Sequence, residues 1–333
     1  MTQSLKVKAV VITRTGGPDV LAVRDIDVPA PGAGEVRIRV RAFGLNRADA
    51  LYRAGRYIET PEPPCGLGLE AAGTVEAVGA GVTDLAPGDA VAVIPPVSVR
   101  RQPLHAEAVV VPAARVVKTP AGMGFDAAAA LWMAYLTAWG AMVAIGGVKA
   151  GDVVAITAAS SSVGIAAIQV ARRVGAIPVA VTRTIAKAAR LRDLGAAHVV
   201  VSEDADVAQA LAGFAPDGVR VVLDPVGGPG LSALTAAMGR DGVLVVYGGL
   251  DAQATPLPVG DVLAKRLSVR GFLVHQVVED AARLAAAKAF ILDGVARGEL
   301  TPVIAARFGL SEIAGAHRYL EGNAQVGKVV VTV

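Results

Sequence analysis

Cysteine is almost absent from this chain of 333 residues. Cys65 is its single cysteine, which excludes an intrachain disulfide and every zinc site built from several thiolates. Histidine is also scarce, and the four histidines (His105, His198, His275 and His317) lack the spacing of metal ligands. We therefore expect no metal-binding residues, while a site built from histidines alone or from histidines and carboxylates stays open at this point.

Long apolar runs and signal-like segments are missing as well. Hydrophobic residues make up 53% of the chain, yet no uninterrupted run reaches the roughly 20 residues that a membrane-spanning helix needs. The longest candidate, around 127–147, contains Tyr135, Thr137 and several glycines, and it predicts a buried helix. Residues 1–6 lack the apolar core of a signal peptide. We expect a soluble, cytoplasmic protein that does not act on a membrane.

Charge of one sign is not concentrated anywhere in the sequence. The formal net charge is +3, and lysines and arginines are scattered, which does not favour a nucleic-acid surface. A small-molecule substrate is the simpler expectation. The basic residues also suit a phosphorylated cofactor, although composition alone does not identify one.

Two patterns divide the chain. The first third alternates short valine-rich runs with Gly/Pro turns, as in a β-barrel or sandwich. From about residue 127 helices and strands alternate, which predicts an α/β fold with a doubly wound parallel sheet. We expect its strands at Val153–Thr157, Pro178–Val181, His198–Val201, Val219–Leu223, Gly242–Tyr247 and Leu267–Leu273.

A serine-rich turn follows the first of these strands. Val154–Thr157 leads into Ala158-Ala159-Ser160-Ser161-Ser162-Val163-Gly164, ahead of a helix expected at Ser162–Val174. Small residues there let the backbone approach a pyrophosphate, and the helix N-terminus supplies free N–H groups. Only Gly164 remains of the usual glycine pattern. The alternative interpretation is a serine-capped helix without a ligand.

The end of the second strand indicates which nicotinamide cofactor fits. A site for NAD places Asp or Glu there to hold the ribose 2′-hydroxyl. This chain instead has Thr182, Arg183 and Thr184, with Lys187 following. Arg183 and Lys187 can pair with a 2′-phosphate, and Thr182 can donate a hydrogen bond, so NADPH is expected. A solvated basic helix start is the alternative.

Taken together, these residues resemble the medium-chain dehydrogenase/reductase superfamily, in particular its zinc-free quinone oxidoreductase-like branch. The resemblance covers essentially the whole chain. Its landmarks are Asn46–Asp49 with Arg53–Tyr57, Gly68–Gly73, Pro87–Asp89, Leu136–Ala138, the serine loop, Asp224–Gly228, Tyr247–Gly249, Val269–Gly271 and Gly327–Val330.

The resemblance implies a GroES-like, β-rich catalytic domain plus a Rossmann domain. The expected boundaries are 1–126 and 275–333 for the GroES-like domain and 127–274 for the Rossmann domain, with the substrate cleft between them. It also implies a homodimer joined near Leu267–Leu273.

Zinc-dependent relatives carry a metal-binding Cys at or beside the position of Asn46, and a His at that of Leu69. Because those ligands are missing, the resemblance implies hydride transfer without zinc, from NADPH to a quinone or an α,β-unsaturated carbonyl. Two alternatives stay open: an enoyl-thioester reductase or carbonyl-reducing alcohol dehydrogenase, and an NADPH-binding structural or regulatory protein without turnover.

The resemblance also assigns site residues. Asn46 would contact the nicotinamide ribose or the substrate oxygen, Thr137 would lie near the nicotinamide amide, and Lys328 would be a cation on the phosphate side. The remaining cofactor-binding residues are Ser161, Ser162 and Val163 through their backbone N–H groups, together with Thr182, Arg183, Lys187, Tyr247, Gly248 and Phe272. A turn-stabilising Asn46, a structural Thr137 and a solvated Lys328 are the alternatives.

One departure concerns the proton donor. Many quinone reductases place a cleft tyrosine five residues after the Asn, where this chain has Leu51, and Tyr52 follows. On a helix a shift of one residue rotates a side chain by about 100°. Tyr52 as a catalytic proton donor is therefore a hypothesis beside a packing or surface role, and solvent could protonate the product instead.

Overall fold

The computed structural model describes residues 4–333, so Met1, Thr2 and Gln3 of the N-terminal segment discussed above lie outside the described residues. The chain divides into two compact units: one contains Met1–Met133 and Pro302–Val333, and the other contains Ala134–Thr301. Both ends of the chain therefore build the first unit.

The first unit is mainly antiparallel sheet. A three-stranded sheet has the order β2-β1-β4, and a larger sheet has the order β15-β16-β3-β5-β6-β8, with β7 paired to β3. Its strands are β1 (Leu5–Ile12), β2 (Leu21–Val28), β3 (Glu35–Leu45), β4 (Cys65–Gly66), β5 (Ala71–Val78), β6 (Ala90–Val93), β7 (Ala108–Pro112), β8 (Val116–Lys118), β15 (Ile304–Gly309) and β16 (Lys328–Thr332). Its helices are α1 (Arg47–Arg53), α2 (Phe125–Ala128) and α11 (Ile313–Glu321).

The second unit is a parallel six-stranded sheet in the order β11-β10-β9-β12-β13-β14. When these six strands are renumbered from 1 to 6 along the chain, their order in the sheet is 3-2-1-4-5-6, which is the order of the dinucleotide-binding Rossmann fold. The strands are β9 (Val153–Ile156), β10 (Ile177–Thr182), β11 (His198–Val201), β12 (Val219–Asp224), β13 (Met238–Val246) and β14 (Ser268–Gly271). The predicted doubly wound sheet is confirmed.

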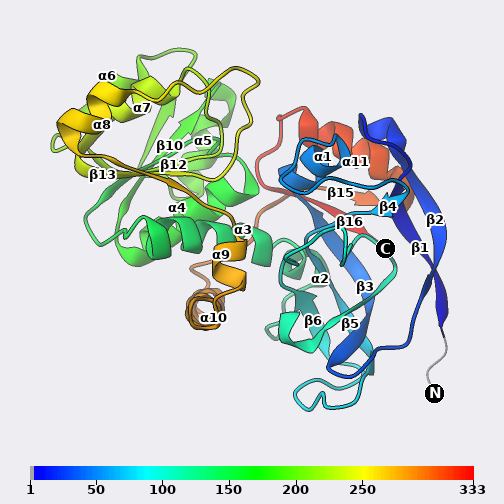
Figure 1. The fold of residues 1–333 in the computed structure, drawn as a ribbon. Coiled ribbons are helices and arrows are strands. Elements are labelled where there is room, and N and C mark those ends of the chain that lie inside the picture. Colours follow the sequence, from blue (N-terminus) through cyan, green and yellow to red (C-terminus); the bar gives the residue numbers. More distant parts are fainter. Residues whose placement is uncertain (1–3) are drawn as a thin grey trace. The chain divides into compact units, whose positions relative to one another are not determined.

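Helices cover both faces of the Rossmann sheet. Helices α6, α7 and α8 lie together over one face, and α4 lies on the other (Figure 1). The α-helices of this unit are α4 (Ser162–Val174), α5 (Ala188–Asp193), α6 (Val207–Phe214), α7 (Leu231–Ala237), α8 (Val259–Lys265), α9 (His275–Val278) and α10 (Ala281–Ala296), while α3 (Trp132–Trp139) carries the chain from the first unit into the second. Most apolar residues of the strands are buried because helices cover both faces.

The division of the chain differs from the expected boundaries after residues 126 and 274. Helix α10 was expected in the first unit but belongs to the second. Arg173 of α4 forms ion pairs with Asp293 and Glu299, and its guanidinium carbon lies 4.7 Å from the centre of the Phe290 ring. These contacts hold α10 against α4, so the chain returns to the first unit only at Pro302.

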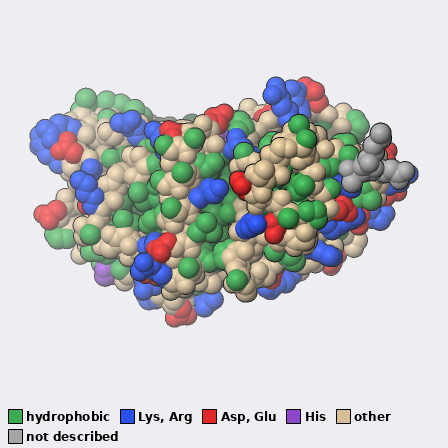
Figure 2. All heavy atoms as spheres, turned by 90° about the horizontal axis from the view of Figure 1, so that it is seen from below, with side chains coloured by type: hydrophobic (Ala, Val, Ile, Leu, Met, Phe, Trp, Pro, Cys, Tyr) green, Lys and Arg blue, Asp and Glu red, His purple; other side chains and the backbone are tan. Residues whose placement is uncertain are grey.

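One helical stretch within residues 4–333 could be mistaken for a membrane span, and it is mostly buried. Residues Phe125–Ile145 are long and apolar enough by composition, but 78% of their most apolar window is buried inside the structure. This agrees with the buried helix expected around 127–147. On the face shown in Figure 2, basic and acidic side chains are interspersed and no large field of one sign is visible.

Candidate active site

The serine loop after β9 has the geometry of a phosphate-binding turn. Ser161 is the N-cap of α4, and its Oγ accepts a hydrogen bond from the Gly164 N–H at 3.0 Å. A Cβ on Gly164 would lie 2.6 Å from Ala159 Cα, so only glycine allows the helix to approach the loop this closely. Ala158 completes the sharp turn with φ of 45°.

The loop leaves a defined set of backbone donors for an anion. The Ser161 N–H donates to the Ala158 carbonyl at 2.9 Å, and the Gly164 N–H is used by the cap. The first N–H groups of a helix have no partner within the helix, which leaves those of Ser162 and Val163 for a ligand. Of the three expected backbone donors, Ser161 is therefore already engaged.

The end of β10 carries the basic residues that the sequence singled out. Thr182 is buried at the end of the strand, and Arg183 follows it with an exposed side chain. The Lys187 side chain reaches the serine loop, where its Nζ donates a hydrogen bond to Ser160 Oγ at 3.1 Å. Burial, together with the nearby charge of Arg183, lowers the pKa of Lys187. The structure thus brings the basic strand end and the serine loop to the same edge of the sheet.

Four further expected cofactor residues lie in or beside the second unit's core. Thr137 is 5% exposed on α3, and Phe272, 3% exposed, follows β14. Tyr247 and Gly248 follow β13, at the same carboxyl edge as the serine loop. A Cβ on Gly248 would lie 2.9 Å from the Pro225 carbonyl oxygen, so the backbone passes close to the neighbouring strand end.

Between these strand ends lies Asp224, for which the sequence suggested no role. Its carboxylate accepts from the Thr157 hydroxyl and from the N–H groups of Val226 and Gly227, the last two at 3.1 and 2.8 Å. Asp224 therefore fixes the turn after β12 against the end of β9, where the strand order of the sheet reverses. Such a reversal is where ligands bind in open α/β sheets.

The first unit contains a buried polar cluster around Asn46. Lys328 Nζ donates to Asn46 Oδ1 at 2.7 Å and also to Glu70 Oε1, and Asn46 Nδ2 donates to Glu70 at 3.0 Å. The second Glu70 oxygen accepts from the Met133 N–H at 3.1 Å. Glu70 and Lys328 are each 1% exposed. The cluster joins the start of α1, the segment before β5 and the start of β16.

This placement bears on the roles expected for Asn46 and Lys328. Asn46 Nδ2 donates to the Gly44 carbonyl at 3.4 Å as well as to Glu70, and Asn46 Oδ1 accepts from Lys328. Both the nitrogen and the oxygen of the side-chain amide therefore have partners inside the unit. The Lys328 ammonium is buried in the same network rather than solvated. Both observations favour a structural role for Lys328 over contact with a phosphate, and a substrate contact of Asn46 stays a prediction.

Asp49 lies one helical turn beyond Asn46 and is also buried. Its Oδ2 accepts from the Asn46 N–H at 2.7 Å, while its Oδ1 is buried without a hydrogen-bond partner among the described residues. Burial raises the pKa of Asp49 from 3.8 to about 7, against the opposing effects of the Asn46 hydrogen bond and the Lys328 charge. The sequence offered a signal for Glu70 alone, as the one carboxylate of the otherwise apolar landmark Gly68–Gly73.

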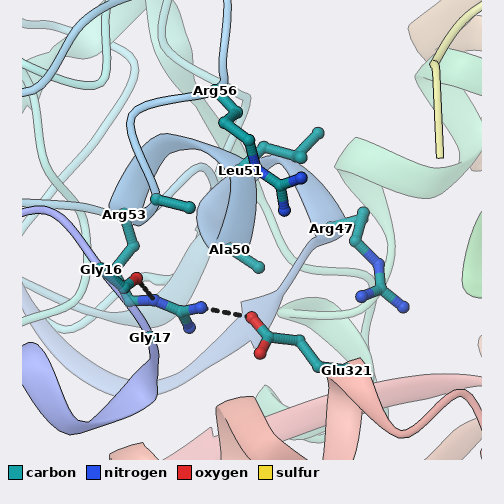
Figure 3. Close-up of a pocket in the computed structure, with 9 residues that line it drawn as sticks. Gly16, Gly17, Arg47, Ala50, Leu51, Arg53, Arg56 and Glu321 are labelled. Atoms are coloured by element: carbon teal, nitrogen blue, oxygen red, sulfur yellow. Dashed lines mark hydrogen bonds and ion pairs between the residues drawn. The ribbon is translucent and has the colours of Figure 1, made fainter. Parts of the chain in front are cut away.

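The structure also shows which side chain of α1 faces a cavity. Leu51 lines a pocket on the surface of the first unit (Figure 3). Tyr52, in contrast, is fully buried in that unit's core. The Tyr52 hydroxyl lies 4.0 Å from Cys65 Sγ, and burial raises its pKa. This position favours packing over proton donation for Tyr52.

The donor set does not fit a zinc ion. No group of three or more His, Cys, Asp or Glu side chains that could hold a metal occurs within residues 4–333. Leu69, at the position where zinc-dependent relatives carry histidine, is fully buried and apolar. Glu70 already binds the Lys328 ammonium, whose positive charge would repel a metal cation.

The chain therefore has the two-domain architecture of a nicotinamide-dependent oxidoreductase. Residues 32–121 match the alcohol dehydrogenase GroES-like domain, and residues 162–289 match the zinc-binding dehydrogenase domain. The chain belongs to the medium-chain dehydrogenase/reductase superfamily, in its quinone oxidoreductase-like branch. It is an oxidoreductase.

Two curated relatives span nearly the whole chain. The 2-haloacrylate reductase of Burkholderia sp. is 32% identical over 98% of both chains. The synaptic vesicle membrane protein VAT-1 homologue of Rattus norvegicus is 30% identical over 97% of this chain and 83% of its own length.

Two solved structures are similar over 98% of this chain. An NAD-dependent alcohol dehydrogenase is 32% identical, with a TM-score of 0.88 over 99% of its own chain. Escherichia coli quinone oxidoreductase, solved as a complex with NADPH, is 26% identical, with a TM-score of 0.89 over 100% of its own chain.

Proposed function

We propose that this protein is an NADPH-dependent, zinc-independent reductase that transfers a hydride to a quinone or an α,β-unsaturated carbonyl. The observation that carries the proposal is the carboxyl end of β10. Arg183 stands there in place of an acid, and Lys187 extends from the same segment to the serine loop. Two basic side chains beside a phosphate-binding turn suit the 2′-phosphate that distinguishes NADPH from NADH.

The residues of the second unit fit such a cofactor. We propose that the N–H groups of Ser162 and Val163 bind its diphosphate and that Arg183, Lys187 and Thr182 hold the 2′-phosphate. Thr137, Tyr247, Gly248 and Phe272 would then line its nicotinamide end. When bound, NADPH supplies the hydride, while the protein orients the acceptor and excludes competing reactions.

The metal-free part of the proposal rests on the first unit. An enone or quinone is electrophilic without a Lewis acid, so its reduction does not need the polarisation that zinc gives an alcohol oxygen. In an enone the β-carbon gains the hydride and the α-carbon gains a proton. Because Tyr52 is buried in the core, we propose that solvent supplies this proton.

The direct test is NADPH oxidation by metal-stripped protein with a panel of acceptors: 1,4-benzoquinone, a 2-alkenal, crotonyl-CoA and a simple ketone. We expect turnover of the quinone or the alkenal, unchanged after zinc is added. Preferential turnover of crotonyl-CoA would identify an enoyl-thioester reductase, and turnover of the ketone a carbonyl reductase. Tight NADPH binding with no turnover would favour a structural or regulatory protein. Stimulation by zinc would refute the metal-free proposal.

Replacing Arg183 with alanine should weaken the preference for NADPH. Loss of a charge-assisted contact is worth about 1.5–3 kcal/mol, so kcat/KM for NADPH should fall about 10- to 100-fold while that for NADH stays the same. Arg192→Ala, which removes an exposed arginine near the end of α5, is the matched control. Equal losses for both cofactors in Arg183→Ala would show that Arg183 does not contact the 2′-phosphate.

We also propose a homodimer formed along the edge of the Rossmann sheet. β14 is the last strand of that sheet, and Val269 on it is 41% exposed. Near it in sequence, Leu257 and Leu263 are 52% and 73% exposed, so further large apolar side chains are available for contact. Light scattering should give twice the 33.6 kDa of one chain, and a mass of one chain would contradict the dimer. A soluble, cytoplasmic enzyme with a small-molecule substrate remains part of this proposal.

A further inference from the structure

The pocket lined by Leu51 is a cavity of about 370 Å³ on the surface of the first unit, beside α1. Ala50 and Leu51 of that helix, together with its C-cap Ala54, form an apolar wall. The rest of the lining comes from the turn at Gly16 and Gly17 and from four charged side chains (Figure 3). A pocket with one small apolar wall and one charged wall suits a small amphipathic molecule.

The charged wall is mostly positive. Arg47, Arg53 and Arg56 line it, and Glu321 is the one acid of the lining. Arg53 is 2% exposed and forms an ion pair with Glu321, and its Nε donates to the Gly16 carbonyl at 3.0 Å. Glu321 is thereby neutralised by an arginine that is fixed in the wall. The Arg56 guanidinium then remains without a carboxylate partner in the pocket lining.

The backbone holds Arg56 beside the pocket. Helix α1 ends at Arg53 with Ala54 as its C-cap, and Gly55, with φ of +71°, turns the chain back over the last helical turn. The Arg56 N–H then donates to the Leu51 carbonyl at 2.8 Å, and the Gly55 N–H to that of Tyr52 at 2.9 Å, which is the hydrogen-bond pattern of a Schellman motif. This turn brings Arg56 next to Leu51, the residue of α1 that faces the cavity.

Arg56 also differs from the other two arginines in its contacts. Arg47 Nη2 donates to the Leu320 carbonyl at 3.1 Å and to Asn323 Oδ1, and Arg53 is held by Gly16 and Glu321. The Arg56 side chain has no hydrogen-bond or ion-pair partner among residues 4–333. Its planar fork of N–H donors matches a carboxylate, which it can bind through two parallel hydrogen bonds.

We propose that this pocket binds an anionic group, a carboxylate, of the electrophilic acceptor, with Arg56 as the binding residue and Arg47 as a second positive charge. The inference rests on the proposed reductase function and narrows its substrate class to small α,β-unsaturated carbonyls that carry a carboxylate. Leu51 and the alanines of α1 contact the short apolar part of the molecule. Asn46 is the N-cap of the same helix, so the pocket and the polar cluster share one rigid element.

The test compares two acceptors that differ by one group. (E)-4-oxopent-2-enoate has a carboxylate where pent-3-en-2-one has a methyl group. The measured quantity is the ratio of kcat/KM for the acid to kcat/KM for the ketone. In Arg56→Gln this ratio should fall at least about tenfold from its wild-type value, because one charge-assisted contact with the carboxylate is lost. Using a ratio cancels the greater intrinsic reactivity of the acid.

Two matched variants separate position from charge. Arg41→Gln removes an exposed arginine of the same unit that does not line the pocket, and its ratio should equal that of wild type. Arg56→Lys keeps the positive charge but loses the planar pair of N–H donors, so its ratio should lie between those of wild type and Arg56→Gln. An unchanged ratio in Arg56→Gln, or an equal fall in Arg41→Gln, overturns the proposal.

Free acetate distinguishes a substrate subsite from a separate anion site. Acetate should inhibit reduction of (E)-4-oxopent-2-enoate competitively in the wild-type protein and only weakly in Arg56→Gln. Inhibition or activation by acetate that does not compete with this substrate overturns the proposal. If neither acceptor is reduced, the reductase function fails on its own, and calorimetric titration with the acid decides the pocket separately. Weaker binding to Arg56→Gln than to Arg41→Gln supports the pocket, and equal binding refutes it.

Discussion

Replacing Lys328 with methionine is expected to lower the free energy of unfolding by about 3–5 kcal/mol, because it leaves the buried Glu70 carboxylate without its counter-ion. Glu70 is 1% exposed, so water cannot replace the lost ammonium. Only the Asn46 amide and the Met133 N–H would remain as its donors, at 3.0 and 3.1 Å. Urea unfolding measures the effect as a lower midpoint at unchanged slope.

Two controls isolate the cause of this loss. Lys118→Met breaks the ion pair with Asp89, whose side chains are 59% and 26% exposed, and it should cost less than about 1 kcal/mol. The double variant Lys328→Met/Glu70→Gln removes both charges and should recover a large part of the stability, since no uncompensated charge remains buried. A Lys328→Met protein as stable as Lys118→Met would show that the cluster is not a coupled ion pair.

The pH dependence of the same variant gives a second readout. The folded-state pKa of Asp49, about 7, lies above its ordinary 3.8, so this residue's contribution to stability is complete below about pH 4 and is lost as pH rises through 7. The Lys328 charge lowers this pKa. Removing the Lys328 charge should therefore raise the Asp49 pKa and extend the loss of stability to higher pH. Unfolding curves recorded between pH 4 and 9 would measure this change.

Replacing Gly164 with alanine should weaken both the fold of the second unit and its binding of NADPH. The added Cβ would lie 2.6 Å from both Cα and O of Ala159, which are backbone atoms and cannot rotate away. Overpacking of this kind costs about 1–3 kcal/mol, and a displaced Ser161 cap adds about 1 kcal/mol. Because α4 must move away from the loop, the N–H groups of Ser162 and Val163 would lose their positions.

Gly213 provides a matched helical glycine. It lies in α6, and a Cβ there would meet no atom within 4 Å, so Gly213→Ala should leave NADPH binding intact and stabilise the protein by up to about 1 kcal/mol. Calorimetric titration of NADPH into both variants measures the difference. Wild-type affinity and stability in Gly164→Ala would contradict a tightly packed phosphate loop.

Local signals in the sequence predicted the Rossmann unit well. Helix α4 was expected at Ser162–Val174 and has these bounds, because a serine cap precedes it and Gly175, with φ of 81°, ends it. Strand β11 likewise has the predicted bounds His198–Val201. Valine-rich runs between glycine turns are a strong pattern, since a strand buried on both faces needs apolar side chains throughout.

Features that depend on distant contacts could not be predicted. The Lys328–Glu70 pair joins residues 258 positions apart, and the motifs that contain them indicate the family without revealing that the two side chains meet. The placement of helix α10 in the second unit depends on distant contacts with α4. Arg173 pairs with Asp293 near the end of α10, and Gln169 donates to the Thr301 carbonyl beyond it.

The central claim, a site built for NADPH that works without zinc, is tested most directly by one comparison. The kcat/KM values of the metal-stripped wild-type protein are measured with NADPH and with NADH, using the same quinone or enone acceptor. We predict a clear preference for NADPH, which zinc does not alter, because Arg183 and Lys187 occupy the place of the ribose-binding acid. Equal values for the two cofactors, or activity that appears only with zinc, would contradict it.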